Sequence, residues 1–368
     1  MAVRILKAEE ALAQLQRFDA VLDARSPAEF ALDHLPGAQS WPVLNDDERR
    51  EVGTQYKQES AFDARKRGAA LVARRIAALL EQHAGDKPRE WQPLVYCWRG
   101  GQRSGTLAWF LDQVGFRVTL LQGGYKAFRA AVREELAVLP GRLQFAVIGG
   151  RTGSGKSRLL QALALHGAQV LDLEALACHR GSVLGALPDV PQPSQKQFDS
   201  RVWQALRGFD ALRPVFVESE SRKIGALQVP EALILRMRGQ GRVCLVDMPL
   251  AARVQLLLED YSHFEADVEG FCALLQGMVE LRGHDTVAQW QRWAWQGQWA
   301  QVFEALVREH YDPLYQRSMD LNYAGLPDAL RLPLTDGGAQ ALDEAARDLM
   351  AQEKTLCVAA QGLIEPTA

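Results

Sequence analysis

An octapeptide with the pattern G-x-x-x-x-G-K-S, residues 150–157, constrains the fold of this chain more than any other stretch. It follows an apolar run at residues 145–148, which is typical of a buried strand, and it precedes residues 159–164, which are typical of a helix. A loop in this setting turns its amides toward phosphate oxygens, and Lys156 adds a mobile positive charge. The motif therefore predicts an α/β domain that binds a nucleoside triphosphate or another diphosphate ester.

Every residue of this loop is a candidate ligand of the diphosphate, and Lys156 is also the candidate catalytic residue. The loop comprises Gly150, Arg151, Thr152, Gly153, Ser154, Gly155, Lys156 and Ser157. If the site uses magnesium, Ser157 would bind it, and Glu218 at the end of a later strand is the candidate second ligand. The alternative is that Glu218 and Asp172 are only solvated strand ends.

Three apolar runs after the loop favour a parallel sheet with alternating helices. They cover residues 169–174, 214–223 and 241–249. From residue 250 to about residue 318 the apolar spacing becomes helical, and an acidic helix is predicted after that. The helical region contains four tryptophans, which either form its core or offer a surface for base stacking or for a prenyl chain. They are Trp290, Trp293, Trp295 and Trp299.

The composition is that of a protein with two separate cores: 368 residues, of which 48% are hydrophobic and 24% charged. A formal net charge of −3 excludes a wholly basic nucleic-acid-binding protein but leaves room for local basic patches. The N-terminus lacks the apolar core of a signal peptide, and no apolar run is long enough to span a membrane. We therefore expect a cytoplasmic protein without membrane contact.

The five cysteines lie far apart and form no C-x-x-C pair, which argues against a zinc site and against a disulfide framework. A reducing cytosol fits this pattern best. Four of the cysteines have apolar or ordinary neighbours and are predicted to be inert. These four are Cys178, Cys244, Cys272 and Cys357.

Cys97 differs from the other cysteines because of the residues that follow it. It ends an apolar strand at residues 94–97, and a loop with two glycines leads from it to a helix that begins near Ser104. The loop amides, the helix N-terminus and the nearby Arg99 and Arg103 would stabilise a thiolate, and also an anion attached to it. Cys97 is therefore the second candidate catalytic residue. The loop around it comprises Trp98, Arg99, Gly100, Gly101, Gln102 and Arg103.

Four successive segments of the first 138 residues resemble the landmarks of a rhodanese domain. They are residues 23–26 (DARS), residues 34–38 (HLPGA), the Cys97 loop and residues 121–125 (LQGGY). In that family the loop cysteine carries sulfur or selenium as a persulfide or perselenide, so the resemblance assigns this role to Cys97. One alternative stays open, because Cys97, Arg103 and Ser104 also have the spacing of cysteine-dependent phosphatases. Against it, Tyr96 stands where those enzymes commonly have His, and no general-acid Asp is evident.

The turn residues at 139–141 (LPG) precede the strand that leads into the phosphate loop, so we place a domain boundary there. The prediction is a rhodanese-like domain at residues 1–138 and the core of a P-loop domain at residues 139–250. Residues 251–368 would form a helical extension that packs on the P-loop domain. The fold class is α/β, with an NTPase-like parallel sheet in the second domain.

The whole chain resembles the bacterial tRNA 2-selenouridine synthase family. The resemblance rests on the Cys97 loop, the phosphate loop, residues 179–182 (HRGS) and residues 220–225 (ESRKIG), in this order, and it covers about residues 5–320. It implies a transferase that replaces sulfur by selenium in the wobble 2-thiouridine of tRNA, through an S-geranyl-2-thiouridine intermediate. The substrates would be geranyl diphosphate and selenophosphate, with no tightly bound cofactor, and an enzyme that supplies selenophosphate is an expected partner.

Binding of tRNA requires phosphate contacts, for which we nominate Arg222, Lys223 and the basic helix at residues 65–75. Asp172, Arg180 and Glu218 are candidate supporting residues of the site. Two other function classes remain open at this point. One is a fused phosphatase and kinase that acts on small molecules, and the other is a scaffold protein with an inactive rhodanese domain, which the intact Cys97, Lys156 and Ser157 argue against.

Overall fold

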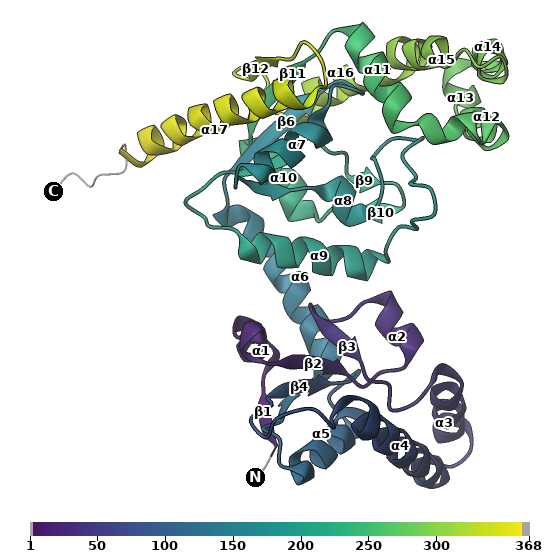
Figure 1. Cartoon of the computed structure of the whole chain (residues 1–368), viewed down its shortest axis with the longest axis vertical. Coiled ribbons are helices and arrows are strands. Elements are labelled where there is room, and N and C mark those ends of the chain that lie inside the picture. Colours follow the sequence, from purple (N-terminus) through teal and green to yellow (C-terminus); the bar gives the residue numbers. More distant parts are fainter. Residues whose placement is uncertain (1–2, 363–368) are drawn as a thin grey trace. The chain divides into compact units, whose positions relative to one another are not determined.

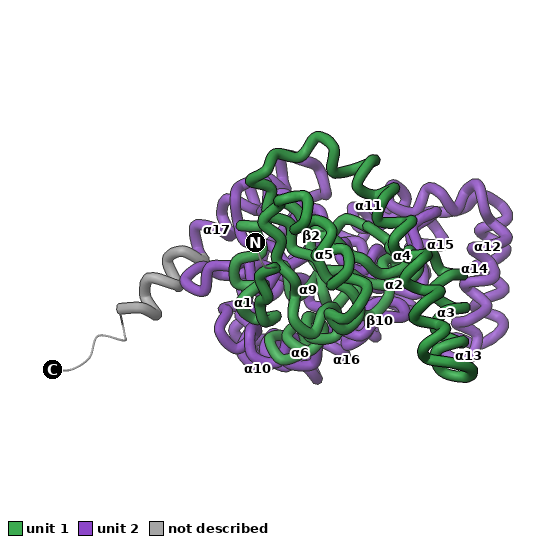
Figure 2. Tube along the Cα trace, turned by 90° about the horizontal axis from the view of Figure 1, so that it is seen from below, with its two compact units in different colours: residues 1–135, 193–204 green, residues 136–192, 205–368 purple. Residues whose placement is uncertain are grey.

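The computed structural model describes residues 3–362, with side chains to residue 352, and divides the chain into two compact units (Figures 1 and 2). Unit 1 comprises residues 1–135 and 193–204, and unit 2 comprises residues 136–192 and 205–368. The turn predicted at residues 139–141 is not present, because helix α6 (Gly124–Arg142) continues through Pro140. The units divide between residues 135 and 136, inside this helix, whereas the predicted boundary is between residues 138 and 139. Segment 193–204, which the sequence placed in the P-loop domain, belongs to unit 1.

Unit 1 is built on a five-stranded parallel sheet with the order β1-β5-β4-β2-β3. Its strands are β1 (Arg4–Leu6), β2 (Ala20–Asp23), β3 (Ala38–Ser40), β4 (Pro93–Tyr96) and β5 (Thr119–Leu121). All four residues of β4 are buried, which explains its uninterrupted apolar sequence. Cys97 directly follows this central strand, at the carboxyl edge of the sheet.

The helices of unit 1 lie in the segments that connect its strands. The segment between β3 and β4 is long and is called the excursion below. The helices are α1 (Ala8–Ala13), the 3₁₀ turn η1 (Leu15–Arg17), α2 (Pro27–Leu32), α3 (Asp46–Gln58), α4 (Ala61–His83) and α5 (Gln102–Val114), together with the start of α6. The excursion consists of α3 and α4, which pack against each other. Helix α4 buries Ala64, Val72, Ile76 and Leu79 and leaves its basic side chains exposed, as its periodicity predicted.

Segment 193–204, which includes most of α9 (Gln195–Gly208), is held in unit 1 by a network of buried polar groups. Arg129 donates to Asp199 Oδ2 at 2.7 Å and to the hydroxyl of Ser200 at 2.9 Å. Ser200 and Tyr125 both donate to Asp33 Oδ2, at 3.1 and 2.8 Å. Such contacts join residues far apart in the sequence, so local patterns did not reveal them.

Unit 2 contains a second parallel sheet of five strands, with the order β12-β11-β6-β8-β7. Its strands are β6 (Phe145–Gly150), β7 (Gln169–Leu171), β8 (Val215–Glu218), β11 (Arg242–Asp247) and β12 (Leu330–Pro333). Strands β7 and β8, which follow β6 in the chain, lie on one side of it in the sheet, and the later strands β11 and β12 lie on the other side. The phosphate loop therefore lies at a topological switch point, where open α/β sheets bind ligands. The four predicted strands are present, whereas β12 was not predicted.

The remaining elements of unit 2 surround this sheet and form the helical extension. They are α7 (Lys156–Leu165), α8 (Leu173–Ala177), β9 (Lys223–Ile224), β10 (Leu227–Gln228), α10 (Glu231–Gln240), α11 (Leu250–Asp260), η2 (Ser262–Glu265), α12 (Val268–Gln276), α13 (Val279–Arg282), α14 (His284–Trp295), α15 (Trp299–Ala305), the π-helical η3 (Leu306–Tyr311), α16 (Asp312–Asn322) and α17 (Ala339–Gly362). Helices α7 and α17 pack side by side (Figure 1).

The tryptophans of the extension are mainly core residues. Trp290 and Trp299 are buried in a cluster that also contains Phe271 and Phe303, while Trp295 is 65% exposed. The alternative roles in base stacking or prenyl binding therefore do not fit the two buried tryptophans. Of the helices in the described part of the chain, none combines the length and the apolar character needed to cross a lipid bilayer.

Candidate functional site

The Cys97 loop is closed by the start of helix α6. The amide of Tyr125 donates to the carbonyl of Cys97 at 2.8 Å, and the amide of Lys126 donates to the carbonyl of Trp98 at 2.9 Å. The thiol is buried, with Cys97 3% exposed, and the hydroxyl of Ser104 in the first turn of α5 donates to its Sγ at 3.1 Å. Helix α5 begins at Gln102, two residues before the predicted start.

Glycine is required at position 124 by both conformation and space. Its φ is +56°, and a Cβ there would lie 2.2 Å from the carbonyl oxygen of Cys97 and 2.5 Å from the amide nitrogen of Gly100. Gly100 itself has a φ of +64° and faces the carbonyl of Leu121 in the same way. The segment at residues 121–125 thus forms one wall of the cysteine loop.

The two loop arginines have different surroundings. Arg103 forms an ion pair with Glu29, with Nη1 2.7 Å from Oε2, whereas Arg99 is exposed. Burial opposes ionisation of Glu29, but the hydrogen bond and charge of Arg103 outweigh it and hold the pKa of Glu29 below its ordinary value. Glu29 was missed by the sequence analysis. The predicted effect of Arg99 and Arg103 on the thiol stays a prediction.

The phosphate loop has the conformation that its glycines predicted. Gly153 and Gly155 have φ angles of +78° and +77°, in the left-handed region that favours glycine. Lys156 opens α7 and donates from Nζ to the carbonyl of Gly150 at 2.9 Å. The amide of Gly150 donates to the hydroxyl of Tyr315 at 2.5 Å. The ammonium group of the lysine thus lies beside the backbone carbonyl at the start of the loop.

A buried arginine fixes the outer side of this loop. Arg253, 2% exposed, donates from Nε to the carbonyl of Thr152 at 2.9 Å and pairs with both carboxylate oxygens of Asp312, at 2.9 and 2.6 Å. Asp312 directly follows the π-helical turn η3, and single π turns in helices are frequent at functional sites. No local sequence pattern pointed to Arg253.

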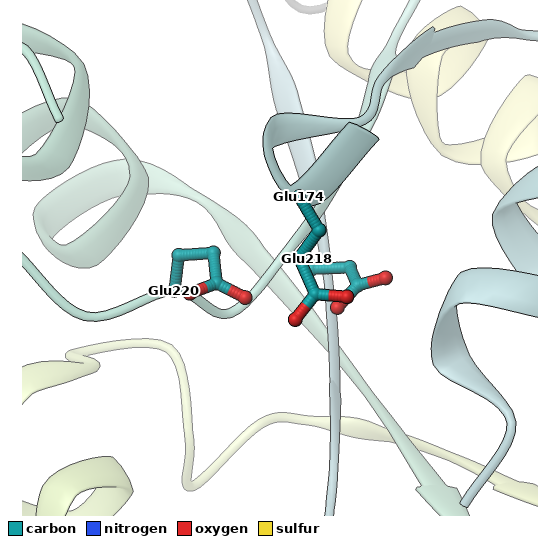
Figure 3. A group of neighbouring side chains, drawn as sticks. All are labelled: Glu174, Glu218 and Glu220. Carbon is teal, nitrogen blue, oxygen red and sulfur yellow. The ribbon is translucent and has the colours of Figure 1, made fainter. Parts of the chain in front are cut away.

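Three glutamates, Glu174, Glu218 and Glu220, lie close to one another, as Figure 3 shows. The hydroxyl of Ser157 donates to Glu174 Oε2 at 3.2 Å, and one ligand atom from each of Glu174, Glu218 and Glu220 lies within 4.8 Å of the others. Glu218 is 2% exposed, and its Oε1 has no hydrogen-bond partner among the described residues. The predicted ligands Ser157 and Glu218 are thus brought together, and Glu174 and Glu220 join them.

The glutamates repel one another in a poorly solvated place. Burial, followed by the charges of Glu218 and Glu220, raises the pKa of Glu174 to about 9. Burial and the charge of Glu218 raise the pKa of Glu220 to about 8, and burial also raises the pKa of Glu218. Asp172, the other predicted carboxylate, instead caps α8 by accepting from the amide of Ala175 at 2.8 Å.

The phosphate loop opens into a cavity of about 430 Å³ that has a polar and an apolar side. The polar side contains residues 152–158, the three glutamates and Arg180, whose guanidinium lies 5.0 Å from the ring centre of Tyr261. The apolar side comes from helices α11 and α16 and the turn before α16. It includes Leu257, Tyr261, Tyr311, Leu314 and Met319. Leu257, Tyr261, Leu314 and Met319 were missed because the helices that carry them reach the loop only through tertiary packing.

The nominated residues Arg222 and Lys223 are exposed at the small antiparallel pair β9 and β10. They do not line the cavity. Their role as phosphate contacts of tRNA therefore stays a prediction. The inert character of Cys178, Cys244 and Cys272 also stays a prediction, and the side chain of Cys357 lies outside those that the structure describes.

Two family models match two successive parts of the chain. Residues 7–131 match the rhodanese-like domain, and residues 143–274 match the tRNA 2-selenouridine synthase AAA domain. The tRNA 2-selenouridine synthase of Hydrogenovibrio crunogenus is 32% identical over 350 residues, which cover 84% of this chain and 93% of that protein. The tRNA 2-selenouridine synthase of Nitrosomonas europaea is 38% identical over 245 residues, 66% of this chain and 63% of that protein. Among solved structures, a rhodanese-related protein from Thermoplasma volcanium is 17% identical with a TM-score of 0.24, covering 35% of this chain and 92% of that chain.

Proposed function

The chain belongs to the tRNA 2-selenouridine synthase family, and from this membership and its two sites we propose that it replaces sulfur by selenium in the wobble 2-thiouridine of tRNA. In the proposed reaction a geranyl group from geranyl diphosphate first alkylates the sulfur. Selenium from selenophosphate then displaces the geranylated sulfur. A cytoplasmic location and an enzyme that supplies selenophosphate are part of the same proposal.

The observation that carries the proposal is the two-sided cavity of unit 2. A prenyl diphosphate has an anionic head and a hydrocarbon tail, and the cavity offers phosphate-loop amides and Lys156 on one side and Leu257, Leu314 and Met319 on the other. Its volume of about 430 Å³ falls in the usual range for small-molecule sites.

In the first stage, the bond between C1 of the geranyl group and the diphosphate oxygen breaks, and a bond from C1 to the thiouridine sulfur forms. The electron pair leaves with the diphosphate, and the uridine loses its N3 proton. Lys156 and the loop amides stabilise the negative charge that develops on the leaving group. Because the loop glycines and Arg253 fix these donors in advance, little reorganisation is needed in the transition state.

In the second stage, a selenium nucleophile attacks C2 of the base, and the S-geranyl group leaves as a thiolate. S-alkylation makes the sulfur a better leaving group than a thiocarbonyl. In this proposal Cys97 and its loop receive the selenium of selenophosphate and deliver it to the base. The P–Se bond breaks, water takes the phosphoryl group to give phosphate, and the selenide that attacks C2 keeps its oxidation state, so no oxidant or reductant is needed. The hydrogen bond from Ser104 and the N-terminus of α5 would stabilise an anion on the sulfur of Cys97.

The acidic cluster next to the phosphate loop fits a magnesium ion. Magnesium prefers oxygen ligands, and Ser157, Glu174, Glu218 and Glu220 offer them, with Glu218 Oε1 buried and without a partner in the described part of the chain. When bound, the ion would neutralise diphosphate charge. These side chains would hold and orient it.

The proposal is tested by nucleoside mass spectrometry on 2-thiouridine tRNA incubated with the full chain. Geranyl diphosphate alone, selenophosphate alone and both together are compared for wild type, Cys97→Ser and Lys156→Ala, with Cys272→Ser as the control for loss of a thiol. We expect geranylation to survive Cys97→Ser but not Lys156→Ala, and selenation to require both residues.

If no modified uridine forms under any condition, the transferase proposal is wrong. A Cys97-dependent turnover of a chromogenic phosphate ester, together with absent tRNA binding, would then favour the fused phosphatase and kinase. If both stages are lost in Cys97→Ser but not in Cys272→Ser, the division of labour between the two units is wrong.

A further inference from the structure

A groove of about 850 Å³ lies in unit 1, between helices α3 and α4 and the first turns of α5. Its floor is apolar and includes Val52, Ala64 and Val72. Its rim carries five cationic side chains, and no carboxylate is among the described residues that line it. The five are Arg49, Arg50, Lys57, Arg65 and Arg103. The groove is therefore a basic patch in a chain whose net charge is negative.

The cations of the rim differ in how far they are neutralised. Arg103 and Arg49 share Glu29, at 2.7 and 3.6 Å, and Arg50 pairs with Asp47 on the surface. Lys57 and Arg65 have no carboxylate partner within the described part of the chain. Arg65 instead lies against Tyr56, with its guanidinium 5.7 Å from the ring centre. Lys57 and Arg65 are thus the rim charges most available to an external anion.

The shape of the groove favours an extended anion over a small one. Four of the five rim side chains are exposed, with those of Arg49 and Arg50 at 52% and 69%, and only that of Arg103 is half-buried, so they do not enclose an ion. Tyr56, 49% exposed, adds an aromatic ring to the same lining, next to Arg65. Spaced cations with an interleaved aromatic side chain are the usual features of a surface that binds single-stranded nucleic acid.

The groove shares an element with the Cys97 site. Gln102, Arg103 and Thr106 of helix α5 line the groove, and Ser104 of the same helix donates to the sulfur of Cys97. A chain bound in the groove would therefore lie beside the helix start that holds the carrier cysteine.

We propose that this groove binds the sugar-phosphate backbone of the substrate RNA next to the nucleoside that is modified. The inference rests on the proposed function and names the part of unit 1 that holds the tRNA. Of the helix at residues 65–75, which the sequence analysis nominated for phosphate contacts with tRNA, the inference keeps only the face that carries Arg65. It adds Lys57 and Tyr56 of α3 as further contacts. The phosphodiesters contact Lys57 and Arg65, and a base stacks on Tyr56.

The test measures binding of labelled tRNA to the full chain between about 50 and 200 mM salt, where phosphate contacts change affinity strongly. The variant is Lys57→Glu combined with Arg65→Glu. The matched control is Arg89→Glu combined with Arg117→Glu, two exposed arginines of unit 1 that lie outside the groove and give the same change in net charge.

We expect the groove variant to lose at least about tenfold in affinity and about 1.5 in the slope of log K against log salt, since each phosphate contact contributes about 0.7 to 0.9. The control should change affinity less than threefold.

Tyr56→Ala, which keeps all charges, should weaken binding by about five- to tenfold with an unchanged salt slope, as expected for loss of one stacked base. Equal losses in the groove variant and the control would overturn the inference, because they would show a long-range charge effect. Unchanged tRNA binding with a raised KM for selenophosphate would also overturn it, since the groove would then serve a small anion. If the wild type binds tRNA but forms no modified uridine, the proposed function fails while the groove inference stands on its own binding data.

Discussion

The Cys97 loop and the phosphate loop are built alike but are stabilised differently. Each follows the central strand of a parallel sheet, each contains glycines with left-handed backbone, and each ends at a helix N-terminus. At the Cys97 loop the buried and half-buried polar groups are paired within the protein, Ser104 with the sulfur and Arg103 with Glu29. Beside the phosphate loop, Glu218 Oε1 and Ser154 Oγ are buried without partners in the described part of the chain.

This difference indicates two kinds of preorganisation. A loop whose buried polar groups are already paired can hold one small anion without help, which suits the proposed carrier loop around Cys97. A loop that leaves buried acceptors unpaired and carboxylates crowded is incomplete until a ligand arrives. The phosphate site should therefore respond strongly to metal and substrate, and the cysteine site should respond mainly to changes in its own backbone.

The largest effect is expected from Gly124→Ala in the wall of the Cys97 loop. A left-handed alanine costs about 1–2 kcal/mol, and its Cβ would lie 2.2 Å from the Cys97 carbonyl, so the loop must move. Displacement of a catalytic group by about 1 Å can cost about 100-fold in rate. We expect selenation to fall by about that factor, while geranylation by unit 2 stays near wild type.

Gly105→Ala is the control for this change, because Gly105 lies in α5 and a Cβ there would meet no atom within 4 Å. It should leave selenation unchanged, and a helical alanine should add about 0.5–1 kcal/mol of stability. Quantitative nucleoside analysis and thermal unfolding measure both outcomes. Equal loss of geranylation and selenation in Gly124→Ala would mean that the two loops do not work independently.

The second prediction concerns pH and magnesium at the acidic cluster. The ordinary pKa of a glutamate is 4.5, whereas that of Glu174 is raised to about 9 and that of Glu220 to about 8. Between pH 4.5 and about 9 the folded chain therefore binds more protons than the unfolded chain. Stability in EDTA should therefore decrease as the pH rises from about 5 to 9. Magnesium should restore it, and more strongly at high pH, because it replaces the protons.

A ligand at about 100 times its Kd adds about 2.7 kcal/mol, which corresponds to roughly 5–10 °C in the unfolding temperature of a unit of this size. Differential scanning fluorimetry over this pH range, with EDTA and with magnesium, measures the effect. Glu218→Gln should reduce the magnesium shift, whereas Glu309→Gln, an exposed change outside the cavity, should not. Stability that rises with pH in EDTA would contradict the prediction.

The same contrast explains what the sequence could predict. The phosphate loop, the Cys97 loop and strands β6, β8 and β11 follow from local patterns, since apolar runs and glycine positions act within a few residues. Strand β12 was missed because only pairing with β11 makes residues 330–333 a strand. Glu29, Arg253 and Tyr315 were missed because they reach their loops from at least about seventy positions away in the chain. Such partners depend on tertiary packing, which no local pattern records.

The smallest effect is expected from Leu314→Ala in the apolar side of the cavity. Leu314 is 43% exposed, so its loss removes about 1 kcal/mol of contact with a bound hydrocarbon chain and should raise the KM for geranyl diphosphate about fivefold. The kcat should change little, because the tail is bound equally in the ground and transition states. Leu321→Ala is the matched control on the same helix, since Leu321 is 73% exposed and lies outside the cavity. Steady-state geranylation kinetics measure both variants, and equal KM values would mean that the hydrocarbon tail of the donor does not lie against Leu314.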